Sequence, residues 1–346
     1  MKKISSLLLL CALSLTACEN ELDITSDFKQ LSVIYALLDP SADTNYVRVQ
    51  RGYLTDQDPQ SSVANPDSLY YDSAEIDVLL REFAPNGGAV VSETPLLFDD
   101  SVPLDSGKFT TDGHHLYRIP PQVDLQSDRQ YEVVVVQPDG EEATGRTGVV
   151  GDIDIRRPPR PISNRVFNGE IEFNVNQGSA AMVAYQVNIL FHYREFNLRT
   201  KDSLFATETI ELPLRESTQS SLAILYDSQA FTNSLSNRIE PKADVIRFFE
   251  GMTIEIYGAA DDLVTYFQLN EPSSSINQNR PTFQQITNGT GLVSSRTLAR
   301  RTDIKLNPNR FTPALLTSDA TCDLRFADVR INGDTCTCSS GSLRCR

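Results

Sequence analysis

The chain has 346 residues, of which 31 are basic and 46 are acidic, so its formal net charge at neutral pH is −15. This acidic excess argues against nucleic acid and anionic lipid headgroups as partners, because both carry negative charge themselves. Tryptophan is absent and the chain has three histidines, which disfavours tryptophan-based sugar platforms and histidine-rich metal or catalytic sites.

The first residues have the layout of a secretory signal. Two lysines precede an apolar stretch at residues 7–13, and a small-residue site follows that ends in Cys18. This layout is typical of signals that are cut before a cysteine that carries the lipid, and the apolar stretch is shorter than the roughly 20 residues of a membrane-spanning helix. We expect residues 1–17 to be a signal peptide and Cys18 to be the lipidated start of an exported bacterial lipoprotein; the alternative is an ordinary signal with an incidental cysteine.

Residues 18–28 are expected to form a lipidated tether. The cysteine is followed by an acidic stretch, Glu19-Asn20-Glu21-Leu22-Asp23. This start resembles the export signals that send some outer-membrane lipoproteins to the cell surface, although charge also suits a plain solvated tether. We therefore expect an outer-membrane location, with the cell surface favoured over the periplasmic face.

Residues 29–155 are predicted to form an antiparallel β-sandwich of the immunoglobulin or transthyretin-like kind. Short β-rich runs alternate with turn signals, and no helical period appears in the first 150 residues. The runs are Leu31–Leu38, Tyr46–Arg51, Ile76–Leu80 and Tyr131–Val136, and the turns are Asp39-Pro40, Asn86-Gly87-Gly88, Asp105-Ser106-Gly107 and Asp139-Gly140. Short strands with this punctuation are typical of a sandwich or a barrel.

A proline-rich segment at residues 156–161 is predicted to link two domains. Its sequence is Arg156-Arg157-Pro158-Pro159-Arg160-Pro161, and so many prolines fit neither a central strand nor a helix interior. The arginines suit a stiff solvated linker better than a recognition patch.

Residues 162–326 are predicted to form a second β-rich domain with one or two short helices. The expected strands are Ile171–Phe173, Met182–Tyr193, Thr207–Leu214 paired with the preceding run, Leu222–Tyr226, and Val245–Phe249 with Met252–Tyr257 as a strand pair or one bent strand. Helices are expected at Ser228–Leu235 and at Asp261–Leu269, where two aspartates suit the positive end of a helix dipole.

Four cysteines lie in the last 25 residues, at Cys322, Cys336, Cys338 and Cys345, the last three of them in a tail at residues 327–346. In an oxidising compartment they indicate two disulfides, for which three pairings are formally possible. A bond between Cys336 and Cys338 would be strained, so each is expected to pair with Cys322 or Cys345. The alternatives are a four-cysteine metal site, which the C-x-C spacing disfavours, and unpaired cysteines.

Three stretches carry a resemblance to a known family: Val33–Leu54, Gly251–Pro272 and Arg280–Arg296. Together they resemble an uncharacterised family of outer-membrane lipoproteins from Gram-negative bacteria that are rich in TonB-dependent transporters. The resemblance covers roughly residues 18–326. It implies a largely β lipoprotein and brings no catalytic residue with it.

Few residues suggest chemistry. His114 and His115 are neighbours that would chelate one metal poorly and are expected to be a solvated loop pair, while His192 is expected to be a half-buried packing residue. Asp39, Asp43 and Asn45 could offer oxygens to calcium, but an Asp/Asn-rich hairpin turn is the simpler interpretation. Two sets of tyrosines are expected to pack rather than to form a contact surface: Tyr70-Tyr71, and Tyr46 with Tyr53.

No nucleophile elbow, metalloprotease motif or phosphate-binding glycine pattern is present in the sequence. We therefore expect no catalytic, cofactor-binding or metal-ligating residues. The sequence favours a lipid-anchored accessory or binding protein that contacts the membrane through its lipid and associates with an outer-membrane transporter or another envelope protein. The alternatives are a carboxylate-dependent hydrolase acting on glycan or peptide, and a structural envelope protein.

Overall fold

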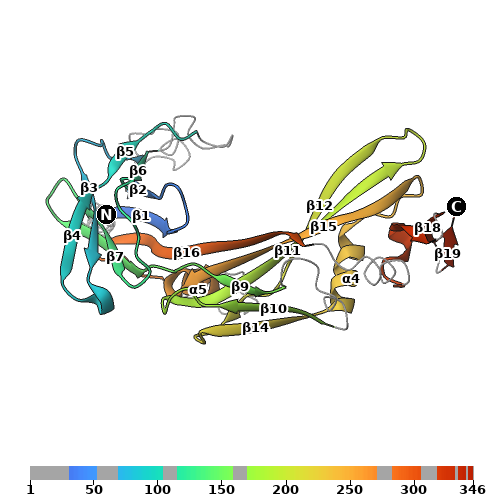
Figure 1. Ribbon diagram of the computed structural model, residues 1–346. Coiled ribbons are helices and arrows are strands. Elements are labelled where there is room, and N and C mark those ends of the chain that lie inside the picture. Colours follow the sequence, from blue (N-terminus) through green and yellow to red (C-terminus); the bar gives the residue numbers. More distant parts are fainter. Residues whose placement is uncertain are drawn as a thin grey trace, which may run out of the picture.

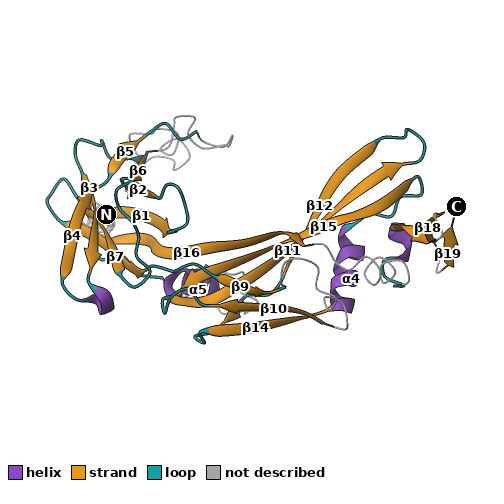
Figure 2. Cartoon of the chain, in the orientation of Figure 1, coloured by secondary structure: helices purple, strands orange, loops and turns teal. Residues whose placement is uncertain are grey.

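The computed structural model describes residues 31–52, 69–103, 115–158, 170–270, 283–304, 318–331, 334–339 and 342–345, and side chains as far as residue 327 except those of Asn86 and Asp303. The predicted signal peptide, the tether, Cys18, Tyr53, His114 and the turn at residues 105–107 lie outside this part. The described chain is mainly β, as predicted (Figure 2). None of its helices is long and apolar enough to cross a membrane.

The strands are β1 (Leu31–Leu38), β2 (Tyr46–Gly52), β3 (Asp77–Phe83), β4 (Val90–Pro95), β5 (Leu97–Asp99), β6 (Leu116–Arg118), β7 (Gln130–Val136), β8 (Glu142–Gly148), β9 (Asp154–Arg157), β10 (Glu170–Asn176), β11 (Met182–Asn197), β12 (Ser203–Glu211), β13 (Arg215–Glu216), β14 (Ser221–Asp227), β15 (Val245–Ala260), β16 (Gly289–Ile304), β17 (Ala327–Ile331), β18 (Asp334–Ser339) and β19 (Ser342–Cys345). The α-helices are α4 (Ser228–Arg238) and α5 (Asp261–Asn270), and the 3-10 helices are η1 (Pro85–Gly87) and η2 (Cys322–Leu324).

A nine-stranded sheet runs through both halves of the molecule in the order β12-β11-β15-β16-β1-β2-β6-β5, with β13 beside β11. At one end its strands β16, β1, β2, β6 and β5 face a second sheet, β4-β3-β7-β8, and together they form the first sandwich (Figure 1). Alternating side chains explain the two layers, since Ile34, Ala36 and Leu38 of β1 point into the same core as Val133 and Val135 of β7.

The strand β16 joins the two halves. Its first part pairs in parallel with β1, and its second part pairs antiparallel with β15. Within residues 29–155 the described strands pair antiparallel, as predicted, and the parallel pair adds a strand from the second half of the chain. The approach is close at Gly291, which has φ +120° and where a Cβ would overlap the carbonyl oxygen of Ile34.

The other end of the large sheet forms a second sandwich. There β12, β11, β15 and the end of β16 face the three strands β14-β10-β9. The helix α4 covers part of this core with Phe231 and Leu235, and the side chain of Asp227 caps it by accepting the N–H of Ala230 at 2.9 Å. Both predicted helices are present. Of the two predictions around Gly251, a strand pair or one bent strand, the structure shows the single strand β15.

The predicted linker begins inside a strand. Arg156 and Arg157 belong to β9, which pairs with β10. Their charges are compensated along the sheet surface, because Arg156 pairs with Asp154 at 2.8 Å and Arg157 pairs with Glu172. Two residues of the predicted linker thus lie in a strand, and the division into two domains remains a prediction.

The C-terminal segment packs against the second sandwich around a buried cation. Arg247 of β15 has no exposed surface, and its guanidinium donates to Glu195 Oε1 at 2.7 Å and to the carbonyl oxygens of Leu324 and Glu240 at 2.6 and 2.8 Å. Its backbone N–H also donates to the carbonyl of Arg325 at 3.0 Å. This cluster fastens residues 322–326 to the large sheet, and the strands β17-β18-β19 follow as a small sheet.

Candidate binding surfaces

The residues weighed for calcium build a turn. The N–H of Asp39 donates to Asn45 Oδ1 at 2.7 Å, and Asn45 Nδ2 donates back to the carbonyl of Asp39 at 3.0 Å. Asp39 Oδ1 also accepts the N–H of Ser41 at 2.9 Å. These contacts confirm the hairpin-turn interpretation. Across the part of the chain that the structure describes, no three His, Cys, Asp or Glu residues lie close enough to hold a metal ion.

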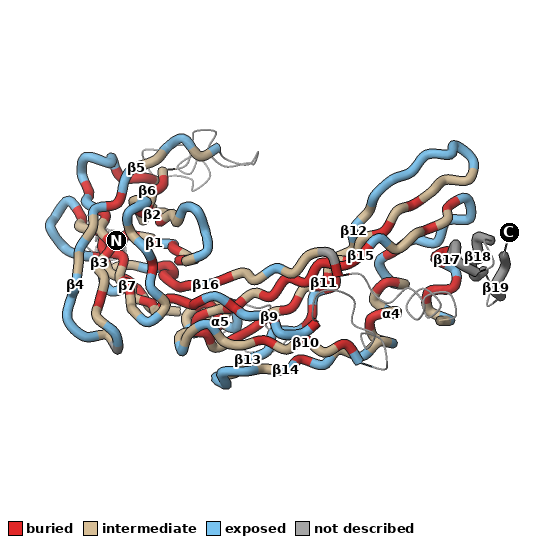
Figure 3. Tube along the Cα trace, viewed as in Figure 1, coloured by how far each residue is buried: buried red, intermediate tan, exposed pale blue. Residues whose placement is uncertain are grey.

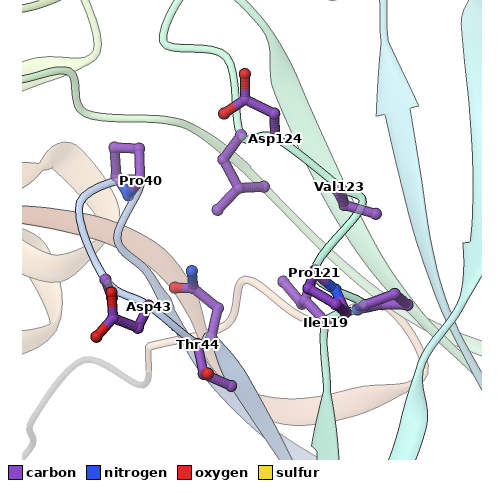
Figure 4. Close-up of a pocket in the computed structure, with 11 residues that line it drawn as sticks. Pro40, Asp43, Thr44, Ile119, Pro121, Val123 and Asp124 are labelled. Carbon is purple, nitrogen blue, oxygen red and sulfur yellow. The ribbon is translucent and has the colours of Figure 1, made fainter.

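A small pocket of about 340 Å³ lies beside this turn, between the β1–β2 loop and the segment that follows β6 (Figure 4). Two carboxylates line it, Asp43 and Asp124, and Figure 4 shows them on separate segments. Both side chains are exposed to solvent. A catalytic carboxylic acid is usually shielded from water, so this pocket gives no support to acid–base chemistry.

His115 belongs to an aromatic cluster. Its ring stacks on Tyr70 at 4.4 Å between centroids and meets Phe98 edge-on at 5.4 Å. Burial raises the pKa of the neighbouring Tyr117 to about 12. The prediction of a solvated loop pair is therefore wrong for His115, because aromatic neighbours distant in sequence enclose the ring.

The other histidine in the described chain and the paired tyrosines pack as predicted. His192 lies on β11 with its two ring nitrogens each 2.9 Å from a threonine hydroxyl, Thr207 on one side and Thr253 on the other. Tyr70 and Tyr71 are buried, and the hydroxyl of Tyr71 lies 3.1 Å from Ser32 Oγ. These side chains stabilise the sheets and offer no reactive group.

A larger groove of about 700 Å³ lies on the face of the large sheet beside α5. Its apolar walls come from α5 and from the loop after β12: they consist of Leu263, Val264 and Phe267 on one side and Leu212, Pro213 and Leu214 on the other, with Leu37 of β1 also lining it. Gln268 of α5 donates to Glu216 of β13 at 2.6 Å and so ties the two walls together. Phe267 and Leu214 remain 55% and 42% exposed, which leaves apolar surface open to a ligand.

The large sheet forms the floor of this groove with polar side chains, and the two outermost of the four strands that contribute them carry opposite charges. Glu211 comes from β12 and Arg296 from β16, and between them lie Gln186 and Asn188 of β11 and Tyr257 of β15. The pKa of Tyr257 is raised by burial and by its hydrogen bond to Glu255 at 3.1 Å. Among the described residues that line the groove, Glu211 is the single carboxylate, so no carboxylate pair for hydrolysis is present there.

A third candidate surface is the edge strand β12, where it runs out beyond the core (Figure 3). Leu204 and Phe205 are 65% and 73% exposed although they are adjacent and point to opposite faces. Phe205 lies opposite Arg194, whose guanidinium stands 5.0 Å from the ring of Phe248. An edge strand with exposed apolar side chains is a template for strand addition by another chain.

Comparison with known proteins gives no assignment. No family model and no curated protein matches the chain. Three solved structures match weakly. The C-terminal globular domain of an oligosaccharyltransferase from Pyrococcus abyssi has 11% identity and a TM-score of 0.24 over 66% of this chain and 46% of that one.

A bacterial ice-binding adhesin has 9% identity and a TM-score of 0.19, over 80% of this chain and 65% of the adhesin. CBD12 from CALX1.2 has 14% identity and a TM-score of 0.17, over 75% of this chain and 94% of that one. Likenesses this weak carry no argument about function.

The groove and the edge strand were not predicted from the sequence. The groove combines residues from position 37 to position 296, which pattern reasoning cannot bring together. Leu204 and Phe205 stand side by side near the start of β12. Because successive strand residues point to opposite faces, two adjacent apolar residues place one of them off the core face of a half-buried strand, which is a weak local signal.

Proposed function

We propose that this protein is a non-enzymatic accessory protein, anchored to the outer membrane by lipid on Cys18, that docks an envelope protein on the edge strand β12. It belongs, in this proposal, to the family of outer-membrane lipoproteins that its sequence resembles, and a TonB-dependent transporter is the favoured partner. The same proposal includes a cleaved signal peptide and a C-terminal tail that disulfides stabilise.

One observation carries the docking proposal: the exposed pair Leu204 and Phe205 on an edge strand without a described neighbour on its outer side. Strand β12 offers its outer row of backbone donors and acceptors, and the apolar pair supplies side chains that a partner would bury. The strand carries Glu208 and Glu211 but neither lysine nor proline, the residues that commonly protect an edge. The carboxylate-dependent hydrolase gains no comparable support from the pockets.

An affinity pull-down from detergent-extracted outer membranes tests the proposal. We expect the wild-type protein to recover an envelope protein in stoichiometric amount, and the double variant Leu204→Ser with Phe205→Ser to recover at most about a tenth as much, because it loses two buried apolar contacts. Mass spectrometry identifies and quantifies the recovered protein.

A matched control removes an apolar pair from another edge strand. Val90 and Val91 on β4 are 52% and 54% exposed, and the double variant Val90→Ser with Val91→Ser is expected to recover the partner like the wild type. Recovery of the protein alone, or loss of the partner only in the β4 variant, would contradict docking on β12.

A further inference from the structure

We propose that the groove beside α5 binds a short apolar peptide with free termini in an extended conformation. This site is separate from the docking edge. Along β11, Asn188 of the groove and Glu195, which lies opposite Leu204, are seven residues apart, or roughly 24 Å. A ligand in the groove therefore leaves the exposed end of β12 free.

The charges of the groove select a ligand with two charged ends. Glu211 and Arg296 line it from β12 and β16, which are three strand spacings apart in the sheet. Neither side chain forms an ion pair with another residue of the described chain. An ammonium group beside Glu211 and a carboxylate beside Arg296 would complement both, and the planar guanidinium suits a carboxylate in particular.

The length of the ligand follows from the strand register. Across the sheet, Glu211 and Arg296 are three strand spacings apart, or roughly 14 Å. Along the strands they are offset by four residues, because Glu211 is level with Glu255 of β15 and Arg296 lies opposite Ala259. The two backbones are thus about 20 Å apart. An extended peptide of four residues spans about 13 Å, and the two long side chains cover the remainder.

The middle of the groove suits a peptide backbone. Asn188 lines the groove and offers a side-chain amide that can donate to a peptide carbonyl. Gln186 lies two residues away on the same face of β11 and offers a second amide. An aliphatic lipid chain would leave these amides and both charges unpaired.

The walls indicate the side chains of the ligand. Phe267 and Leu214 present exposed apolar surface on opposite sides, and the Gln268–Glu216 hydrogen bond holds their elements together. Leucine, valine or alanine side chains would bury this surface. A peptide with charged side chains would gain less from it.

Isothermal titration calorimetry on the full-length, detergent-extracted protein tests the proposal. The probe is a synthetic tetrapeptide of leucine and alanine with free termini. We expect saturable binding that weakens about tenfold or more when the C-terminus is amidated, and similarly when the N-terminus is acetylated, because each change removes one charged contact.

Charge-removing variants assign each end. We expect Arg296→Gln to weaken binding of the free peptide about tenfold and to make binding insensitive to C-terminal amidation. We expect Glu211→Gln to weaken binding by a similar factor and to make binding insensitive to N-terminal acetylation. Both side chains are exposed, so both variants should keep the thermal unfolding midpoint of the wild type. Arg199→Gln, in the turn between β11 and β12, is the matched control and should bind like the wild type.

Three results would overturn the proposal: no binding of the free peptide, equal binding of the free and doubly blocked peptides, or an amidation effect that persists in Arg296→Gln. None of them bears on docking at β12, because the pull-down uses a different surface. Conversely, peptide binding without recovery of a partner would leave the groove intact and refute the docking proposal.

Discussion

At the scale of single residues, the main feature is a buried ion pair, in which Arg247 is surrounded by Glu195 and backbone carbonyls. The guanidinium is fully buried and is compensated by Glu195, whose second oxygen accepts from Lys242 Nζ at 3.0 Å. Burial by itself raises the pKa of Glu195, but the hydrogen bonds and charges of Lys242 and Arg247 outweigh it, so the pKa of this carboxyl is lowered. The carboxyl of Glu195 is therefore expected to be ionised in the folded protein near neutral pH.

Replacing the buried cation should weaken the fold strongly. We expect Arg247→Met to lower the free energy of unfolding by about 3–5 kcal/mol, because it leaves Glu195 and the carbonyls of Leu324 and Glu240 short of donors. Urea unfolding at neutral pH measures the change. The control Arg199→Met removes an exposed cation with 78% side-chain exposure and should change it by less than about 1 kcal/mol. Equal effects of the two variants would contradict the argument.

Acid should remove the contribution of the same cluster. Because the folded-state pKa of Glu195 lies below its ordinary value of 4.5, its stabilising effect is complete at pH values above 4.5 and is lost as the pH falls through the folded-state pKa. The stability difference between wild type and Glu195→Gln should therefore shrink on acidification below about pH 4.5. A difference that grows in acid would show that the sign is wrong.

At the scale of elements, the C-terminal strands bear on the cysteine pairing. The backbone register places Cys336 of β18 directly opposite Cys345 of β19, while Cys338 lies opposite Leu343. Opposite residues of an antiparallel pair have Cα atoms about 4.5–5.5 Å apart, which suits a disulfide. Cys322 is buried in η2, which packs against β18, and it has an interaction partner.

We therefore expect the pairs Cys336–Cys345 and Cys322–Cys338. Peptide mapping of the unreduced protein by mass spectrometry should recover these two linkages. Recovery of Cys322 linked to Cys336, or of four free thiols after export, would contradict the prediction. Of the two pairings that the sequence left open, the strand register selects one.

The elements themselves were predictable where a local pattern was strong. The β-rich run of β7 and the alternation of β2 gave strands, and the paired aspartates of α5 gave a helix. Strand β8 was missed, because its sequence EATGRTG contains two glycines and no large apolar residue. A glycine is nevertheless required at position 145. A Cβ there would overlap Val293 of β16 and Ile286 of the segment before β16.

At the scale of the whole molecule, Figure 1 shows two sandwiches lying end to end along β16. Ile286 and Val293 belong to the core of the first sandwich, although residues 162–326 were predicted to form the second domain. The bridge between Thr144 of β8 and Thr287 adds to the connection. No local pattern could indicate this, because the partners of β1 and β16 are set by packing and not by neighbouring sequence.

A fragment of residues 29–155 should therefore not fold alone. It lacks the strand beside β1 and two core side chains, so we expect no cooperative thermal transition by circular dichroism, whereas a fragment that also carries residues 283–304 on a flexible linker should show one. Cooperative unfolding of the shorter fragment would show that the first sandwich is an independent domain.

The parallel pairing of β1 with β16 also governs the order of folding. Ser295 Oγ accepts the N–H of Val150 at 2.9 Å and donates to the carbonyl of Leu38, a residue 257 positions earlier. A chain that emerges from its N-terminus has produced most of its length before this contact can form, and closing so long a loop makes folding slow. Until then the side of β1 that pairs with β16 is an unpaired strand edge, so the nascent chain is open to aggregation from the synthesis of β1 until β16 has been made.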